Sequence, residues 1–163
     1  MPDPTRPVAG APIDTDWGQQ VHDATFTPKG VRVAGGTASS VDAAFEQLQL
    51  NTATDDPGGW LASDTLTVPA GAGGLYEMFM RIRADEGTIG EQLRWQIRVN
   101  GTTVISGRID NDGSTAVTEA VGDLLELAAG DQINVWAAKT GGASIDALVV
   151  ALAFVRRGTE IGA

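Results

Sequence analysis

The sequence has 163 residues, a formal net charge of −10 and no cysteine. This length fits one domain with an appendage, and the charge excludes non-specific nucleic-acid binding, because a polyanion would be repelled. The lack of cysteine excludes a disulfide scaffold and thiolate metal sites. Twenty-one glycines indicate many turns, and the sequence contains no run of about 18 apolar residues that would predict a membrane span.

Residues 1–24 differ in composition from the rest of the chain. Four prolines hinder regular strand pairing, and four aspartates make the segment acidic. A disordered tail is one interpretation, but the segment contains apolar side chains that could be buried against another protein. We favour an arm that orders against another subunit or a partner, and we expect three residues to dock it: Ile13, Trp17 and Val21. The segment also lacks the apolar core of a signal peptide, so we expect assembly in a cytosol.

The next residues predict short strands. Segments 25–27 and 31–33 are β-rich and flank a Pro-Lys-Gly turn. Segment 41–50 fits two structures, because its apolar residues have helical spacing and also suit a bent strand. We favour a strand that starts near Ala44.

Residues 66–83 contain two extended runs separated by a glycine-rich turn. In the second run, alternate residues are apolar and fall on one face of a strand, and we expect this strand to organise the core. These residues are Tyr76, Met78, Met80 and Ile82.

The middle of the chain predicts a hairpin followed by two further strands. Asn100-Gly101 is a two-residue turn signal between runs 93–99 and 102–109. Trp95 is in phase with the apolar residues of its run and is expected in the core. Run 117–127 follows, with a bulge expected at Gly122. In run 133–137, Trp136 is out of phase with its apolar neighbours, which makes it a candidate ligand or interface surface.

The last predicted strand, 145–155, is apolar on both faces. In an antiparallel strand with one solvent-exposed face, apolar residues would alternate with polar ones. We therefore expect one face in the sandwich core and the other against another subunit. The bulkier face, expected in the core, consists of Leu148, Val150, Leu152 and Phe154, and the opposite face consists of Ala147, Val149, Ala151 and Ala153.

About eight or nine strands separated by short turns predict an all-β fold, an antiparallel jelly-roll β-sandwich with an extended N-terminal arm. We expect the arm at 1–24, the jelly-roll domain at 25–158 and a C-terminal tail at 159–163.

The sequence offers little for catalysis. The single histidine, His22, lies in the arm, which is unsuited to orient a triad. Carboxylate pairs such as Glu86 and Glu91 are expected by chance in an acidic protein. We expect no catalytic residue, no metal and no cofactor, and hence no enzyme. Four arginines could form a basic patch for an anionic glycan or DNA, but we favour pairing with acids or a subunit contact: Arg81, Arg83, Arg94 and Arg98.

Three segments carry a resemblance to a known family. A Gly-Gly-Trp-Leu turn at 58–61 precedes Thr67-Val68-Pro69, which is followed by Gly-Leu-Tyr at 74–76. Segment 127–133 reads Leu-x-x-Gly-Asp-Gln-Ile, and an apolar closing strand contains Phe154. Over residues 26–157 this order resembles C1q/TNF-like jelly-roll domains. The resemblance implies a homotrimer, in which the inner sheets pack around a three-fold axis.

The combination of this domain with a proline-rich arm also resembles virion proteins of tailed phages. That resemblance implies a capsid decoration protein or head fibre, a structural component of the virion whose arm grips the major capsid protein or another virion protein. The alternative is a receptor- or carbohydrate-binding module of a phage tail fibre or tail tip, which would use Trp136 or loop residues.

Overall fold

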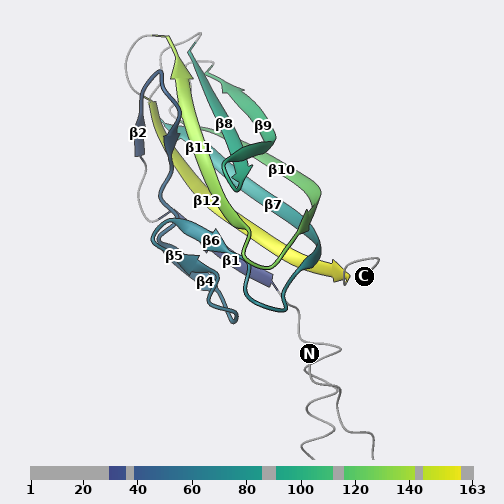
Figure 1. Ribbon diagram of the computed structural model, residues 1–163. Helices are drawn as coiled ribbons and strands as arrows, with labels where there is room; N and C mark the ends of the chain where they lie inside the picture. The colour runs from purple at the N-terminus through teal and green to yellow at the C-terminus, as the bar shows by residue number, and fades with distance from the viewer. Residues whose placement is uncertain (1–29, 36–38, 86–90, 112–115, 142–144, 159–163) are drawn as a thin grey trace, which may run out of the picture.

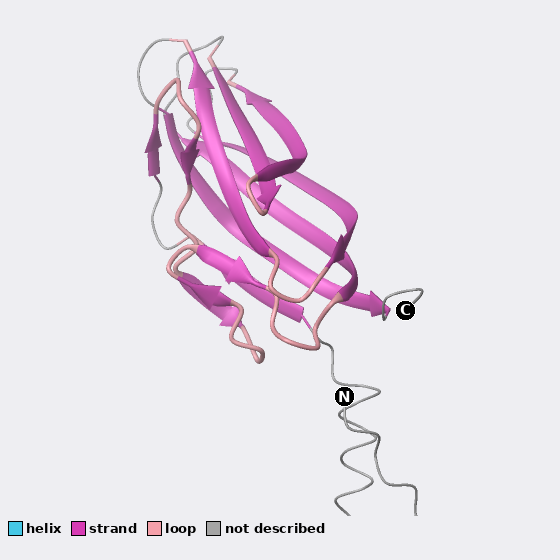
Figure 2. Cartoon of the chain, in the orientation of Figure 1, coloured by secondary structure: helices cyan, strands magenta, loops and turns pink. Residues whose placement is uncertain are grey.

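The protein is an all-β sandwich of two stacked sheets (Figures 1 and 2). The computed structural model describes residues 30–35, 39–85, 91–111, 116–141 and 145–158, which form twelve strands and no helix. The predicted arm (1–24) with its three docking residues, the predicted strand 25–27 and the predicted tail (159–163) lie outside the described residues.

Sheet A contains six strands in the order β10-β7-β12-β1-β4, and β2 pairs with β12. Their bounds are β1 Gly30–Ala34, β2 Ser39–Val41, β4 Thr52–Asp55, β7 Gly74–Asp85, β10 Ala116–Leu127 and β12 Ile145–Gly158.

Sheet B also contains six strands, in the order β5-β6-β11-β8-β9, and β3 pairs with β11. Their bounds are β3 Glu46–Gln47, β5 Leu61–Ala62, β6 Thr65–Thr67, β8 Gln92–Val99, β9 Thr102–Asp110 and β11 Gln132–Thr140. The pairings within both sheets are antiparallel, so the predicted antiparallel jelly-roll sandwich is confirmed.

The core lies between the two sheets and follows the period-two alternation of the sequence. On β7 the four predicted core residues are all buried, and Trp95 of β8 is buried as expected. Trp60 fills one end of the core, with its ring centroid 5.4 Å from that of Tyr76 and 6.2 Å from that of Phe154. Trp60 therefore joins the loop before β5 to two strands of sheet A.

Two local predictions have different outcomes. The preference for a strand in segment 41–50 is confirmed, because β3 lies there and the Leu48 amide donates to the carbonyl of Val135 at 2.8 Å. The bulge expected at Gly122 is wrong. β10 pairs with β7 from Ala116 to Leu127 without a register shift, and Gly122 lies opposite Phe79 on the outward face.

The last strand departs from its predicted division into two faces. A β-bulge between Val149 and Ala151 inserts one extra residue opposite β7 and reverses the inward and outward phases. Before the bulge the buried residues are Ile145, Ala147 and Val149, and after it they are Leu152 and Phe154.

The expected core face is therefore wrong for Leu148 and Val150, which are only half-buried, and the expected subunit face is wrong for Ala147 and Val149, which are buried in the core. Leu152 and Phe154 are in the core as predicted, and Ala151 and Ala153 are half-buried on the outward side. A single inserted residue changes the side to which every later residue points, and strict alternation cannot reveal it.

The bulge can be tested with two leucines on the same strand. Leu152→Ala should reduce the free energy of unfolding by about 2–5 kcal/mol, because it leaves a cavity in the core. Leu148→Ala should cost less, on the order of 1 kcal/mol, because its side chain is only half-buried on the opposite side of the sheet. Urea denaturation followed by circular dichroism measures both, and equal losses would contradict the phase reversal.

Candidate functional site

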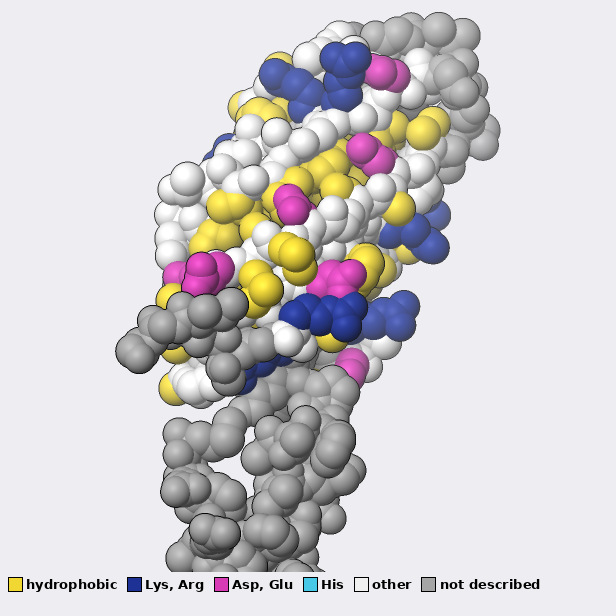
Figure 3. All heavy atoms as spheres, turned by 90° about the vertical axis from the view of Figure 1, so that its right-hand side faces the viewer, with side chains coloured by type: hydrophobic (Ala, Val, Ile, Leu, Met, Phe, Trp, Pro, Cys, Tyr) yellow, Lys and Arg dark blue, Asp and Glu magenta, His cyan; other side chains and the backbone are white. Residues whose placement is uncertain are grey.

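The outward face of sheet A carries a cluster of exposed apolar side chains. Phe79 on β7, Leu124 on β10 and Val155 on β12 are 47%, 57% and 36% exposed. The pairing places them together, because Phe79 lies opposite Ala153 of β12 while Leu124 and Val155 both lie opposite Glu77 of β7. Seen from the side of the molecule that carries β10, hydrophobic side chains gather over the middle of the surface, with acidic side chains among them and basic groups toward the upper and lower ends (Figure 3).

We call Phe79, Leu124, Val155 and the half-buried Ala151 and Ala153 the sheet A patch. Ion pairs within sheet A lie near this patch. Arg83 and Asp85 are 2.6 Å apart, and Arg157 pairs with Glu77. Glu77 lies between Leu124 and Val155, so the patch combines apolar side chains with an ion pair, and such mixed surfaces are typical of contacts between proteins.

The opposite layer, sheet B, presents polar and aromatic side chains outward. Buried Leu93, Trp95 and Ile97 on β8 fix the direction of the residues between them. Those residues, Arg94, Gln96 and Arg98, therefore project from the outward surface of the sheet. The β8–β11 register places Trp136 opposite Gln96, and the β8–β9 register places Ser106 opposite Gln96 as well.

Two aromatic rings meet the arginines of β8. The ring of Phe45, just before β3, lies 5.3 Å from the Arg94 guanidinium carbon and 5.6 Å from that of Arg98. Arg98 also lies over the ring of Trp136, at 4.4 Å from its centroid. Each contact joins a cation to the negative face of an aromatic ring. Trp136 is therefore half-buried on the outward side, as predicted, with Arg98 stacked on it.

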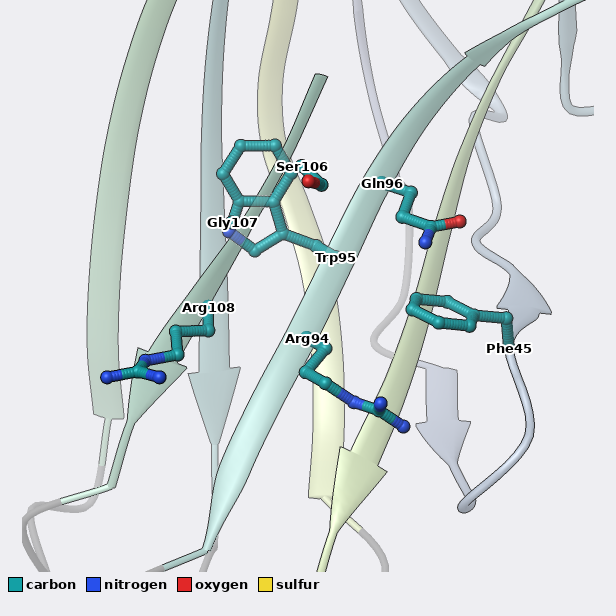
Figure 4. A pocket seen from close by; sticks show the side chains of 7 residues that line it. All are labelled: Phe45, Arg94, Trp95, Gln96, Ser106, Gly107 and Arg108. Carbon is teal, nitrogen blue, oxygen red and sulfur yellow. The ribbon is translucent and has the colours of Figure 1, made fainter. Parts of the chain in front are cut away.

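A pocket of about 330 Å³ opens beside this cluster. Figure 4 shows that the Arg94 guanidinium and the Gln96 amide project toward Phe45, whereas Arg108 points away on the other side of β8. The residues that line the pocket are Phe45, Arg94, Trp95, Gln96, Ser106, Gly107 and Arg108. We call it the β8 pocket.

The β8 pocket contains hydrogen-bond donors that the described residues leave unused. Arg94 Nε is buried and has no acceptor among them. Arg98 donates from Nε and Nη2 to Gln96 Oε1 at 3.0 and 2.8 Å, and the Thr103 hydroxyl donates to the same oxygen at 3.1 Å. These bonds fix the amide orientation, so Gln96 Nε2 is a donor for which the described part of the chain provides no acceptor.

Ion pairing does not neutralise the two arginines nearest Phe45. Arg83, Arg108 and Arg157 form ion pairs with acidic residues, whereas Arg94 and Arg98 form none with the described residues. Of the four arginines that we expected to pair with acids or to lie at a subunit contact, Arg83 pairs with Asp85, and the subunit contact stays a prediction. The β8 pocket is a local site of positive charge on a protein whose net charge is −10.

The floor of the β8 pocket depends on a glycine. Gly107 on β9 lies opposite Trp95, and a Cβ atom at this position would lie 2.3 Å from Cζ2 of the Trp95 ring. The ring is held in place because its Nε1 donates to Glu119 Oε2 of β10 at 2.6 Å. Only a residue without a side chain lets the buried ring approach β9 this closely.

Sequence reasoning identified Trp136 and listed Arg94 and Arg98, but it missed Phe45 and Gln96 as members of one site. Phe45 is about fifty residues from β8 in sequence, and only the pairing of β3 with β11 brings it near. Alternation along β8 was the one available signal, since it indicated that Gln96 shares the outward side with both arginines.

The described residues do not form a candidate metal centre. None of their His, Cys, Asp and Glu side chains form a group of three or more that could hold a metal ion. Burial raises the pKa of the Tyr76 phenol, and the positive charge of Arg156 acts against this rise. The Tyr76 hydroxyl donates to the carbonyl of Ala72 and so closes the turn before β7, which is a structural role.

No described helix is long and apolar enough to cross a membrane.

Comparisons with known proteins identify the fold. No family model matches the sequence, and no curated protein matches it. Among solved structures, the globular domain of zebrafish complement 1qA aligns with a TM-score of 0.60 and 16% identity over 80% of this chain and 98% of that one. The Eiger TNF of S. frugiperda aligns with a TM-score of 0.58 and 12% identity over 83% and 96% of the two chains.

Murine APRIL aligns with a TM-score of 0.57 and 14% identity over 79% of this chain and 98% of that one. At these identities the likeness concerns the fold alone. The chain therefore has the jelly-roll fold of C1q- and TNF-like domains, as the motif resemblance implied.

Gly107→Ala tests the floor of the β8 pocket. The added methyl group overlaps the Trp95 ring, so we expect a loss of about 1–3 kcal/mol in the free energy of unfolding. Ser106→Ala, at the exposed neighbouring position, is the matched control and should change it by less than about 0.5 kcal/mol. Thermal and urea denaturation measure both variants. An unchanged Gly107→Ala protein would show that Trp95 can move aside without cost.

Proposed function

We propose that the protein is a non-enzymatic structural component of a tailed-phage virion, a homotrimeric capsid decoration protein or head fibre. The observation that carries this proposal is the sheet A patch, an apolar surface that a single chain leaves exposed. The jelly-roll fold supports it, because the resemblance to C1q/TNF-like domains implies packing of the corresponding sheets around a three-fold axis.

In the proposed trimer, each copy covers part of the sheet A patch of a neighbour. Phe79 and Leu124 are the most exposed large apolar side chains described, and both lie on this surface. Burying apolar area drives association, and identical copies related by rotation close into a ring without leaving an open surface. The outward residues of β12, Ala151 and Ala153, are small enough to let another chain approach the sheet closely.

The trimer predicts the effect of a charge placed in the sheet A patch. The native protein should have a mass near three times 16.9 kDa in solution. Leu124→Glu should reduce this to the mass of one chain at micromolar concentration, because a buried carboxylate without a partner is strongly unfavourable.

Ala62→Glu, at an exposed position of β5 in sheet B, is the matched control and should leave the trimer intact. Light scattering coupled to size exclusion measures all three proteins, and circular dichroism confirms that each is folded. A native protein that is monomeric at this concentration would refute the trimer.

The N-terminal arm is the proposed attachment device. Residues 1–24 combine prolines, aspartates and the three apolar residues Ile13, Trp17 and Val21. Such a segment can order on a surface and bind through a few anchors. The proposed partner is the major capsid protein or another virion protein, and the proposed location is the virion after assembly in the host cytoplasm. The net charge of −10 disfavours nucleic acid as the partner.

Deletion of residues 1–24 separates attachment from folding. We expect the truncated protein to remain a folded trimer and to lose binding to the particle. Trp17→Ala in the full chain should weaken binding by more than about 2 kcal/mol, as interface tryptophans often do. Trp136→Ala, a tryptophan of the domain surface, is the control and should not affect attachment. Co-sedimentation with particles measures each protein, and full binding by the truncated chain would place the contact on the jelly roll.

The second candidate function, a receptor- or carbohydrate-binding module of a tail fibre or tail tip, is favoured by a different observation. The β8 pocket offers unused donors beside two aromatic rings, which are groups that recognise ligands. The proposed trimer contact lies on sheet A and the β8 pocket lies on sheet B. A trimer is therefore compatible with both candidate functions.

A further inference from the structure

The unused donors of the β8 pocket define what it can bind. Arg94 Nε and Gln96 Nε2 are donors without an acceptor among the described residues, while Gln96 Oε1 already accepts from three donors. A pocket that presents donors and positive charge takes a ligand rich in acceptors and negative charge. The planar fork of Arg94 matches a carboxylate, which can accept two parallel hydrogen bonds.

We propose that the β8 pocket binds the carboxylate of an acidic sugar, such as a uronic acid unit of a polysaccharide. The carboxylate is received by Arg94, and the sugar ring lies against Phe45 and receives hydrogen bonds from Gln96 and Ser106. This inference names the ligand class of the second candidate function and rests on that function. It does not depend on attachment through the arm.

The size and walls of the pocket favour a sugar over an acidic peptide. Its volume of about 330 Å³ is at the lower end for ligand pockets and fits one small ring. An extended peptide recognised by a sheet pairs with the main chain at a free strand edge. Arg94 and Gln96 instead project from the face of β8, a strand paired on both sides by β9 and β11, and Ser106 projects from the same face of the edge strand β9. Phe45 supplies the apolar wall that the C–H groups of a sugar ring require.

The position of Arg94 explains how an acidic protein can hold an acidic ligand. Arg94 stacks on Phe45, which partly shields it from solvent, and it has no carboxylate partner among the described residues. Its attraction for a bound carboxylate is therefore stronger than that of a fully solvated surface arginine. Arg98 contributes a second positive charge, and its bonds to Gln96 hold the amide in position.

The closing experiment titrates the full-length protein with a short galacturonic acid oligosaccharide by isothermal titration calorimetry. The methyl ester of the same oligosaccharide is the ligand control, because it keeps the rings and removes the charge. We expect saturable binding of the acid that weakens as sodium chloride rises, and at least tenfold weaker binding of the ester. Equal binding of the two, or no binding of the acid, would overturn the proposal.

Three variants locate the site. Arg94→Gln should weaken binding of the acid roughly tenfold or more, since it removes a charge-assisted hydrogen bond. Phe45→Ala should also weaken binding of the acid. This second variant tests the site even if Arg94→Gln impairs folding. Arg32→Gln is the matched control and should retain binding within about twofold, because Arg32 is an exposed arginine on β1 of sheet A, the layer opposite the β8 pocket.

Two further measurements distinguish the possible failures. A glutamate-rich peptide is titrated in parallel. If it binds more tightly than the sugar, and Arg94→Gln weakens this binding, the ligand of the pocket is an acidic protein segment and the sugar proposal is wrong. The mass of each variant is measured by light scattering. If the native protein is a trimer that does not bind the sugar, the ligand proposal is wrong and the trimer proposal is supported. If it is a monomer that binds the sugar, the trimer proposal is wrong and the ligand proposal is supported.

Discussion

Asp131 connects three segments at one end of the sandwich, next to the start of the β8–β11 pairing that carries the residues of the β8 pocket. Its carboxylate accepts hydrogen bonds from the Ala128 amide and from Asn100 Nδ2, both at 2.8 Å. Its carbonyl accepts from the Val68 amide at 2.9 Å, and the Asn100 side chain in turn accepts from the Gln132 amide. One acidic residue thus connects the loop after β6, the β8–β9 turn and the start of β11. The motifs around Val68 and Asp131 that carried the family resemblance are in direct contact.

This network sets the register between β8 and β11. Pairing starts at Ile133 and Val99, directly beside Asp131 and Asn100, and continues along both strands. The same register puts Trp136 beside Gln96 and within stacking distance of Arg98. A slip of one residue would turn these side chains into the core. The position of the pocket residues therefore depends on the register that begins at this end of the sheet.

The sequence predicted most of the fold because alternation and turn chemistry are local signals. The buried residues of β7 and the Asn100-Gly101 turn followed from patterns within about ten residues, and both are present. The bulge between Val149 and Ala151 was missed because apolar residues occupy both sides of that strand, so a change of phase leaves no trace in the composition. The β8 pocket was missed because Phe45 reaches Arg94 only through pairing of strands far apart in sequence.

The two layers of the sandwich present different surfaces, and a partly buried hydrogen bond connects them. Trp95 of sheet B donates to Glu119 of sheet A, which satisfies an indole group that could not otherwise be buried without cost. The same ring forms the floor of the β8 pocket, and Glu119 lies on β10, the strand that carries Leu124 of the sheet A patch. Neighbouring residues of β10 point to opposite sides of the sheet, so Glu119 faces the core and Leu124 faces outward. The apolar surface is thus available for the proposed assembly and the polar surface for the proposed ligand, and Trp95 lies between them.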